Sequence, residues 1–90
     1  MLAYNERDGI VTVDGRDIPL TPRQNDIVSL LWQERPHYVS THKLEAKLFG
    51  SAISTENIKV YVRRMRGRGV PIESRPWWGY RLAASPEGPG

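Results

Sequence analysis

The segment from Ile58 to Gly69, with the sequence IKVYVRRMRGRG, concentrates groups that bind anions. It has no acidic residue, and its five cations are Lys59, Arg63, Arg64, Arg66 and Arg68. A guanidinium group presents a planar fork of donors that matches a phosphate or the O6 and N7 acceptors of guanine. A solvated helix face usually mixes both signs, because opposite charges four residues apart stabilise a helix. The segment therefore indicates binding to a polyanion, and a solvated face that only keeps the protein soluble is the alternative.

The charge of the whole chain is unevenly placed. The 90 residues have a formal net charge of +3. Residues 1–58 hold six Lys/Arg and eight Asp/Glu, whereas residues 59–81 hold seven Lys/Arg and one Asp/Glu. A concentration of positive charge on one part of a small domain most often binds a nucleic acid.

Composition excludes several other classes of protein. The chain has no Cys, which rules out disulfides and Cys-based metal sites. His37 and His42 are spaced unfavourably for a shared metal, and we expect no metal or cofactor. Neither a Ser/His/Asp arrangement nor a carboxylate pair suggests catalysis, so we do not expect an enzyme. Without a signal-peptide pattern or a long apolar run, no membrane association is expected and the predicted location is cytoplasmic.

The first third of the chain predicts a hairpin followed by a helix. Residues 10–20, IVTVDGRDIPL, have strand-forming residues on both sides of Asp14-Gly15, a favoured two-residue turn. Pro19 places the returning strand at a sheet edge or at its own end. An earlier strand over residues 2–4 is only weakly indicated. The sequence TPRQ then opens a helix with a capping box, which Pro36 stops.

Two further helices and a second hairpin follow. One helix begins at Ser40 and ends before Gly50, and the next begins near Ser54 or Thr55. The third helix repeats apolar residues with helical spacing, at Ile58, Tyr61, Val62 and Met65. The sequence VPIESRPWWGYRL then predicts a hairpin with a turn around Arg75-Pro76, and the Pro/Gly/Ser-rich residues 84–90 are expected to be disordered.

The order of these elements defines a fold class. Two short helices followed by a basic helix form a helix-turn-helix, and the trailing hairpin makes it winged. The predicted architecture is α+β, with an N-terminal β-hairpin or small sheet, three helices and a C-terminal β-hairpin wing. One domain is expected over residues 1–83, since 90 residues suffice for a single thin core.

Four motifs in this order resemble the winged-helix DNA-binding domain of OmpR/PhoB-type response regulators. PLTPRQNDIVSLL is similar to the Leu-Thr-x-x-Glu opening of the family's first helix, and VSTHKLEAKLFG resembles its second helix. NIKVYVRRMR resembles the recognition helix, commonly V-D-V-x-I-x-x-L-R, and WGYRL resembles the end of the wing, usually R-G-x-G-Y-R. The resemblance extends from about Ile10 to Leu82.

The sequence departs from the family at several positions. Gln24 stands where the family usually has Glu, and Lys59 stands where it often has Asp. In the wing, Pro76-Trp77 replaces the usual Arg-Gly pair. The loop SAIS, residues 51–54, is short, and in the family this loop commonly contacts RNA polymerase. Nothing in the chain resembles a phosphoacceptor receiver domain, so we expect either an excised domain or a free-standing regulator.

The resemblance implies roles for the exposed face of the third helix. Val60, Arg63 and Arg64 would reach base edges in the major groove of double-stranded DNA, while Tyr61 and Arg66 would touch phosphates. Lys59 lies on the flank of this face. Thr55 and Asn57 belong to the first turn, where free N–H groups suit a phosphate, but the favoured interpretation of these two residues is capping alone.

Three more arginines surround the second hairpin, namely Arg68, Arg75 and Arg81. As a wing, this hairpin would lie along the DNA backbone, with Arg75 or Trp77 entering a minor groove, where narrow A·T tracts attract arginine. For Arg68 and Arg81 the alternative is an unpaired surface charge.

The two tryptophans of this hairpin lead to different expectations. Trp78 shares strand parity with Tyr80 and Leu82, so we expect it in the core. Trp77 has the opposite parity. It either projects as a contact to phosphate or to a partner, or packs on the third helix.

Together these patterns predict a sequence-specific DNA-binding transcription regulator. The residues assigned to the DNA interface are Thr55, Asn57, Lys59, Val60, Tyr61, Arg63, Arg64, Arg66, Arg68, Arg75, Trp77 and Arg81. One module makes few contacts, so self-association on tandem half-sites is expected. The alternatives are a protein-interaction module that docks an acidic partner, such as an RNA polymerase subunit or another regulator, and a module that binds structured RNA.

Overall fold

The computed structural model describes residues 2–48 and 55–83, and of residues 55–57 only the backbone. The predicted disordered tail, residues 84–90, lies outside the described residues. So do Phe49 and Gly50, expected at the end of the second helix, and the loop 51–54 that would contact RNA polymerase.

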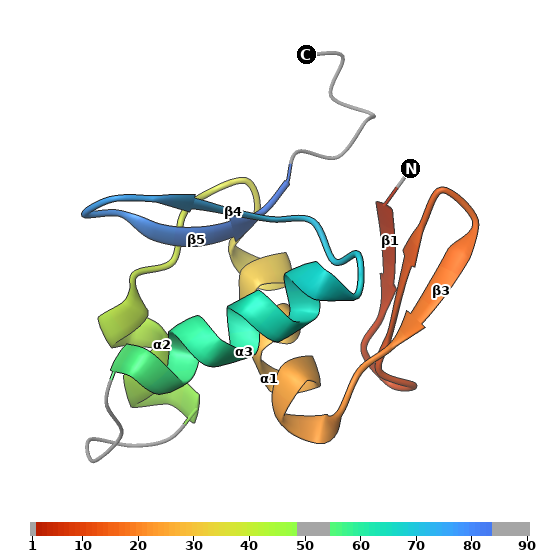
Figure 1. The fold of residues 1–90 in the computed structure, drawn as a ribbon, viewed down its shortest axis with the longest axis horizontal. Helices are drawn as coiled ribbons and strands as arrows, with labels where there is room; N and C mark the ends of the chain where they lie inside the picture. Colours follow the sequence, from red (N-terminus) through yellow and green to blue (C-terminus); the bar gives the residue numbers. More distant parts are fainter. Residues whose placement is uncertain (1, 49–54, 84–90) are drawn as a thin grey trace.

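The N-terminal segment forms a three-stranded antiparallel sheet in the order β1-β2-β3, at one end of the domain (Figure 1). The strands are β1 (Leu2–Asn5), β2 (Ile10–Val13) and β3 (Arg16–Pro19). Asp14 and Gly15 have φ values of 51° and 84°, as the predicted two-residue turn requires. Pro19 ends the edge strand β3, as predicted. The weakly indicated first strand is present, so β2 is the central strand and pairs with a neighbour on both sides.

Helix α1 (Pro22–Glu34) begins with the predicted capping box. The Gln24 amide donates to Thr21 Oγ1 at 3.3 Å, and Gln24 Oε1 accepts from the Thr21 amide at 3.1 Å. The helix ends just before Arg35-Pro36. Local side-chain chemistry therefore determines where α1 begins, and proline determines where it ends.

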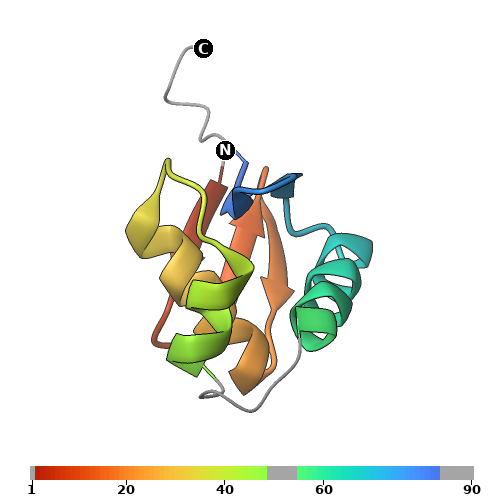
Figure 2. The ribbon, with the colours of Figure 1, turned by 90° about the vertical axis from the view of Figure 1, so that its left-hand side faces the viewer.

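Helices α2 (Thr41–Leu48) and α3 (Thr55–Gly67) complete the helix-turn-helix. Ser40 caps α2 as predicted, since its hydroxyl accepts from the Lys43 amide at 3.0 Å. The α2 helix packs against α3, and α1 packs against the C-terminal hairpin. Viewed from the side, α3 stands on the opposite flank of the domain from α1 (Figure 2).

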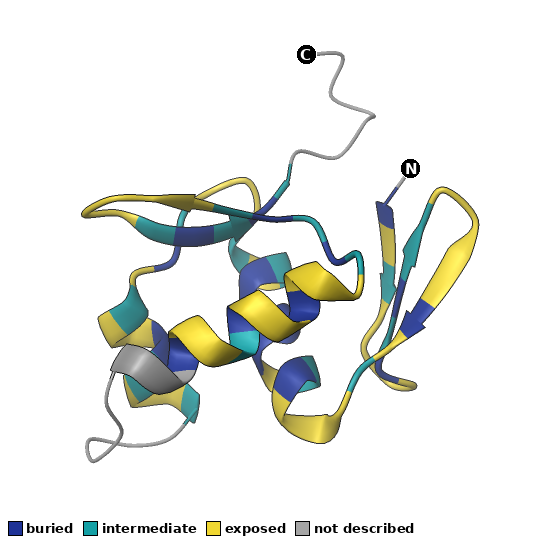
Figure 3. Ribbon diagram, in the orientation of Figure 1, coloured by how far each residue is buried: buried dark blue, intermediate teal, exposed yellow. Residues whose placement is uncertain are grey.

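The core lies between the helices and the two β-structures, with α3 exposing only its outer surface (Figure 3). The side chains that are almost completely buried are Val11, Ile27, Val28, Leu31, Val39, Leu44, Ile58, Val62, Met65 and Val70. Among the described residues, no helix has the length and apolar character needed to cross a membrane.

The C-terminal hairpin consists of β4 (Ile72–Arg75) and β5 (Gly79–Leu82). Its last residue pair is Arg75 with Gly79, so the turn contains three residues, 76–78. The prediction that Trp78 belongs to the core was wrong, because its side chain is 56% exposed. Strand alternation starts only at Gly79, and Trp78 belongs to the turn. The architecture is nevertheless the predicted α+β winged helix-turn-helix.

Candidate nucleic-acid interface

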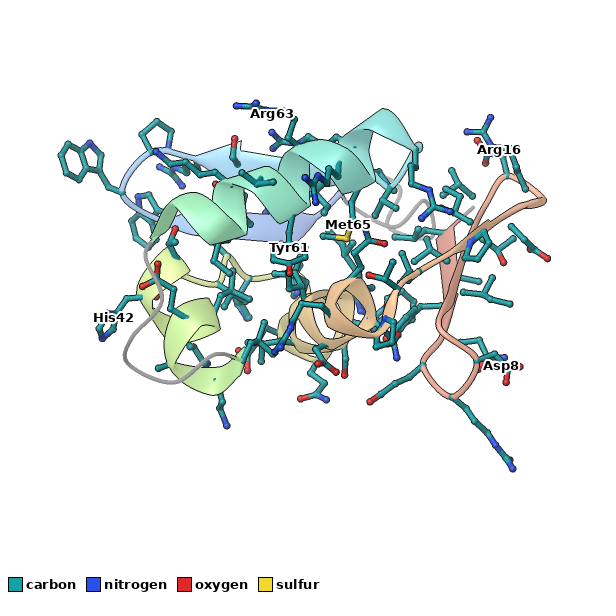
Figure 4. The ribbon with its side chains drawn as sticks, turned by 60° about the horizontal axis from the view of Figure 1, so that its bottom comes forward. Asp8, Arg16, His42, Tyr61, Arg63 and Met65 are labelled. Carbon is teal, nitrogen blue, oxygen red and sulfur yellow. The ribbon has the colours of Figure 1, made fainter. Side chains whose placement is uncertain are left out.

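The outer face of α3 is the first component of the candidate interface. Ile58, Val62 and Met65 are buried, and the intervening cations lie on the solvent side. Figure 4 shows Arg63 pointing away from the other helices, whereas Tyr61 and Met65 point toward them. The apolar spacing of the helix thus fixes which side chains are presented to a partner.

Three cations of this face are available for an external anion. Lys59, Arg63 and Arg64 are exposed and form no ion pair with any carboxylate whose side chain the structure describes, that is, among residues 2–48 and 58–83. Val60 lies beside them with 38% of its surface exposed. The face therefore combines three free positive charges with one small apolar side chain, a composition suited to phosphates and base edges.

Other predicted site residues on α3 and just after it have internal contacts. Arg66 Nε donates to the Ile72 carbonyl at 2.8 Å and thereby connects α3 to β4. Arg68 Nη1 lies 3.5 Å from Gln24 Oε1. Tyr61 is half-buried and packs against the core. The side chains of Thr55 and Asn57, in the first turn of α3, lie outside the described residues.

The β4–β5 hairpin is the second component, and it is attached to the chain between α1 and α2. The Val39 amide donates to the Tyr80 carbonyl at 2.7 Å, and the Tyr80 amide donates to the Val39 carbonyl at 2.9 Å. Gly79, with φ of 112°, permits this approach: a Cβ atom there would lie 2.0 Å from the Val39 oxygen. The hairpin therefore has a fixed position relative to α2.

Arg81 takes part in this attachment. Its Nε donates to Glu73 Oε1 at 2.7 Å, and its Nη1 donates to the Pro36 carbonyl at 3.2 Å. The guanidinium also lies 4.5 Å from the centroid of the Tyr38 ring. The hydrogen bond to Glu73 raises the pKa of Arg81. Arg81 is thus not the unpaired surface charge that we considered, and its contacts distinguish it from the free cations of α3.

An open groove with a volume of about 490 Å³ lies between these two components. It is lined by Ser40 and Thr41 at the start of α2, by Lys59 of α3, and by residues 74–80 of the hairpin. Arg75 is exposed, with its guanidinium 5.0 Å from the Trp78 ring centroid, and Trp77 is fully exposed. The structure therefore brings Lys59 of α3 to the same groove as Arg75 and Trp77 of the hairpin, which lie 16 and 18 positions further along the sequence.

Sequence reasoning missed the groove and its supports. Glu73 and Arg81 are direct partners in the hairpin register, but this pairing follows only once the turn is known to contain three residues. The bridge between Val39 and Tyr80 joins segments that carry no pairing signal of their own. Gly79 was the available signal, because a glycine inside a strand often marks a close approach of another backbone.

Comparisons with known proteins place this arrangement among solved structures. No protein-family model matches the sequence, and a search of curated proteins finds no match either. The C-terminal domain of the lantibiotic response regulator NsrR, the nisin resistance regulator, is 26% identical, with a TM-score of 0.74 over 90% of this chain and 89% of that one.

Two further structures have the same fold at lower identity. The DNA-binding domain of Bacillus subtilis CssR is 23% identical, with a TM-score of 0.73 over 91% of this chain and 99% of that one. The DNA-binding domain of the response regulator AdeR, solved in complex with an intercistronic region, is 16% identical, with a TM-score of 0.73 over 93% and 95%. The predicted resemblance to the winged-helix DNA-binding domains of OmpR/PhoB-type response regulators is confirmed.

Proposed function

We propose that this winged-helix domain of the OmpR/PhoB type binds double-stranded DNA sequence-specifically and regulates transcription. In this proposal α3 enters the major groove with Val60, Arg63 and Arg64 toward base edges. Lys59 and Arg75 would contact the backbone beside it, and Arg66 and Arg81 would hold the hairpin in place. The structural neighbours described above support this assignment, because NsrR and AdeR are response regulators and the CssR and AdeR structures are of DNA-binding domains.

The observation that carries the proposal is the free charge of α3. An arginine that is not paired within the protein keeps its donors for a ligand, and bidentate contact to guanine requires such an arginine. Arg63 and Arg64 meet this condition among the described residues. The same observation would also fit an acidic protein surface, so the deciding experiment must measure sequence preference.

The proposal is tested by selecting ligands from a pool of random DNA duplexes with the wild-type chain. We expect one enriched motif. Replacing Arg63 or Arg64 with alanine should weaken binding to that motif by about 1–3 kcal/mol, or about 5- to 150-fold, and relax preference at one position.

The matched control is Arg7→Ala. Arg7 is exposed in the turn between β1 and β2, beside Asp8, which Figure 4 shows far from Arg63. The Arg7→Ala substitution removes one positive charge without changing α3, so binding to the selected motif should change little. Failure to enrich any motif would refute sequence-specific binding. An equal effect of all three substitutions would show that only net charge matters.

We further propose that two copies bind tandem half-sites, because one α3 helix reaches few base pairs. The selected motif should then contain two similar elements. Analytical ultracentrifugation with the selected duplex should give two chains per duplex, whereas a single chain per duplex would contradict this part of the proposal.

A further inference from the structure

The turn of the β4–β5 hairpin holds an aromatic side chain in an unusual position. Trp77 is 100% exposed and has φ of 74°, in the left-handed region. The Trp78 amide donates to the Arg75 carbonyl at 3.0 Å, and Pro76 precedes Trp77, which is the arrangement of a type II turn. Glycine is the residue that this position normally requires, because a side chain at positive φ is strained.

Pro76 and the turn hydrogen bond favour this backbone conformation, but the Trp77 side chain itself gains no buried contact within the described residues. A buried tryptophan gains free energy from the area removed from water, but Trp77 is not covered by other groups. A large apolar side chain that is both strained and fully exposed indicates that its contacts are made with a partner.

The surroundings of Trp77 indicate the chemistry of that partner. The groove beside it contains the basic residues Lys59 and Arg75, and among the side chains that the structure describes no Asp or Glu lines it. An aromatic face next to positive charge fits a base flanked by phosphates, since aromatic rings stack on bases and cations contact the backbone. The hairpin turn also projects beyond the helices at one end of the domain (Figure 1).

The position of the turn is fixed by the protein core. The pair of hydrogen bonds between Val39 and Tyr80 holds β5, and the Ala83 amide donates to the Pro71 carbonyl at 2.7 Å where the hairpin begins. A side chain on a firmly held turn can enter a narrow groove without a large loss of conformational entropy.

From these observations we propose that Trp77 inserts between two base pairs through the minor groove and bends the duplex. This inference rests on the proposed DNA binding and adds a mode of recognition to it. Apolar wedges that enter from the minor groove unstack a base step and kink DNA toward the major groove. Because α3 would occupy the neighbouring major groove, such a kink would increase contact with the protein. Base steps that unstack easily would then be preferred.

The test compares the wild-type chain with Trp77→Gly and Trp77→Phe on the selected duplex. Glycine removes the wedge and also relieves the positive φ, so Tm should stay the same or rise. Binding of Trp77→Gly should nevertheless weaken about 5- to 150-fold, the loss expected when one stacked base is given up. Trp77→Phe retains an aromatic ring and should keep most of the affinity.

Two measurements identify a wedge specifically. Energy transfer between dyes at the duplex ends should report a bend with the wild type and a smaller one with Trp77→Gly. A single mismatch moved through the site should strengthen wild-type binding at the inserted step, because unstacking there is already easier. With Trp77→Gly, the mismatch should not strengthen binding at any position in the site.

The outcomes separate this inference from the proposed function. Equal affinity and equal bending for the wild type and Trp77→Gly would refute the wedge and leave DNA binding by α3 intact. If the wild type binds all duplexes equally well, without preference for any sequence, the proposed function itself is refuted. A loss of affinity with unchanged bending and no mismatch effect would refute insertion, and would show that Trp77 contacts the DNA only from outside.

Discussion

Replacing Gly79 with alanine should destabilise the domain more than any other single methyl addition at a described glycine. The new Cβ would lie 2.0 Å from the Val39 oxygen and 2.7 Å from Ser40 Cα, both backbone atoms that cannot turn away. The Val39–Tyr80 bridge must therefore open. Its two hydrogen bonds contribute about 1 kcal/mol each, and the backbone strain of a residue at this φ adds about 1–3 kcal/mol.

The expected loss is thus about 3–5 kcal/mol in the free energy of unfolding. A domain of 90 residues has a total stability of about 5–13 kcal/mol. The variant should consequently be close to unfolding at ordinary temperature, with Tm lowered by more than about 12 °C. Urea denaturation measures the free energy of unfolding and thermal unfolding measures Tm, both followed by circular dichroism.

Two other glycines separate the clash from the backbone strain. Gly15 also has positive φ, 84°, but a Cβ there would meet nothing within 4 Å, so Gly15→Ala should lose only the strain term. Gly67 is helical with open space around it, and Gly67→Ala should leave stability unchanged or raise it. The reasoning would be refuted if Gly79→Ala destabilised the domain no more than Gly15→Ala.

Two further predictions concern the N-terminal half. Thr21→Ala should lower the free energy of unfolding by about 1 kcal/mol in urea denaturation, because it removes the cap of α1, and Thr21→Ser should restore it. Burial, together with the charges of Glu6 and Asp26, raises the pKa of Tyr4 to about 12. The folded state therefore holds the proton more tightly, so stability should fall as pH rises from about 10 to about 12. Tyr4→Phe should flatten this decline, and an unchanged pH profile would contradict it.

The features that could be predicted from the sequence are those that depend on local chemistry. The turn at Asp14-Gly15 and the cap at Thr21 need only neighbouring residues, so their sequences are sufficient. The outer face of α3 also follows from local spacing, because the buried residues Ile58, Val62 and Met65 leave only one orientation for the helix.

The features that could not be predicted depend on register and on distant segments. The parity of Trp78 was misjudged because alternation was extended through residues that the hairpin uses as a turn. The pairing of Arg81 with Glu73 depends on the same register. The groove at Lys59 and Arg75 exists only because the bridge at Val39 sets the hairpin against α2, and no local pattern encodes that distance.

The closure of the hairpin at Arg75 and Gly79 has a consequence for evolution and for engineering. The contacts described above that anchor the hairpin lie at this pair or on its body side, so the fold constrains residues 76–78 through the backbone of the turn and not through side-chain packing. New tips can be exchanged there by mutation or by design while the scaffold stays intact. The binding preference of a domain built in this way can therefore change through substitutions in the turn while the architecture stays the same.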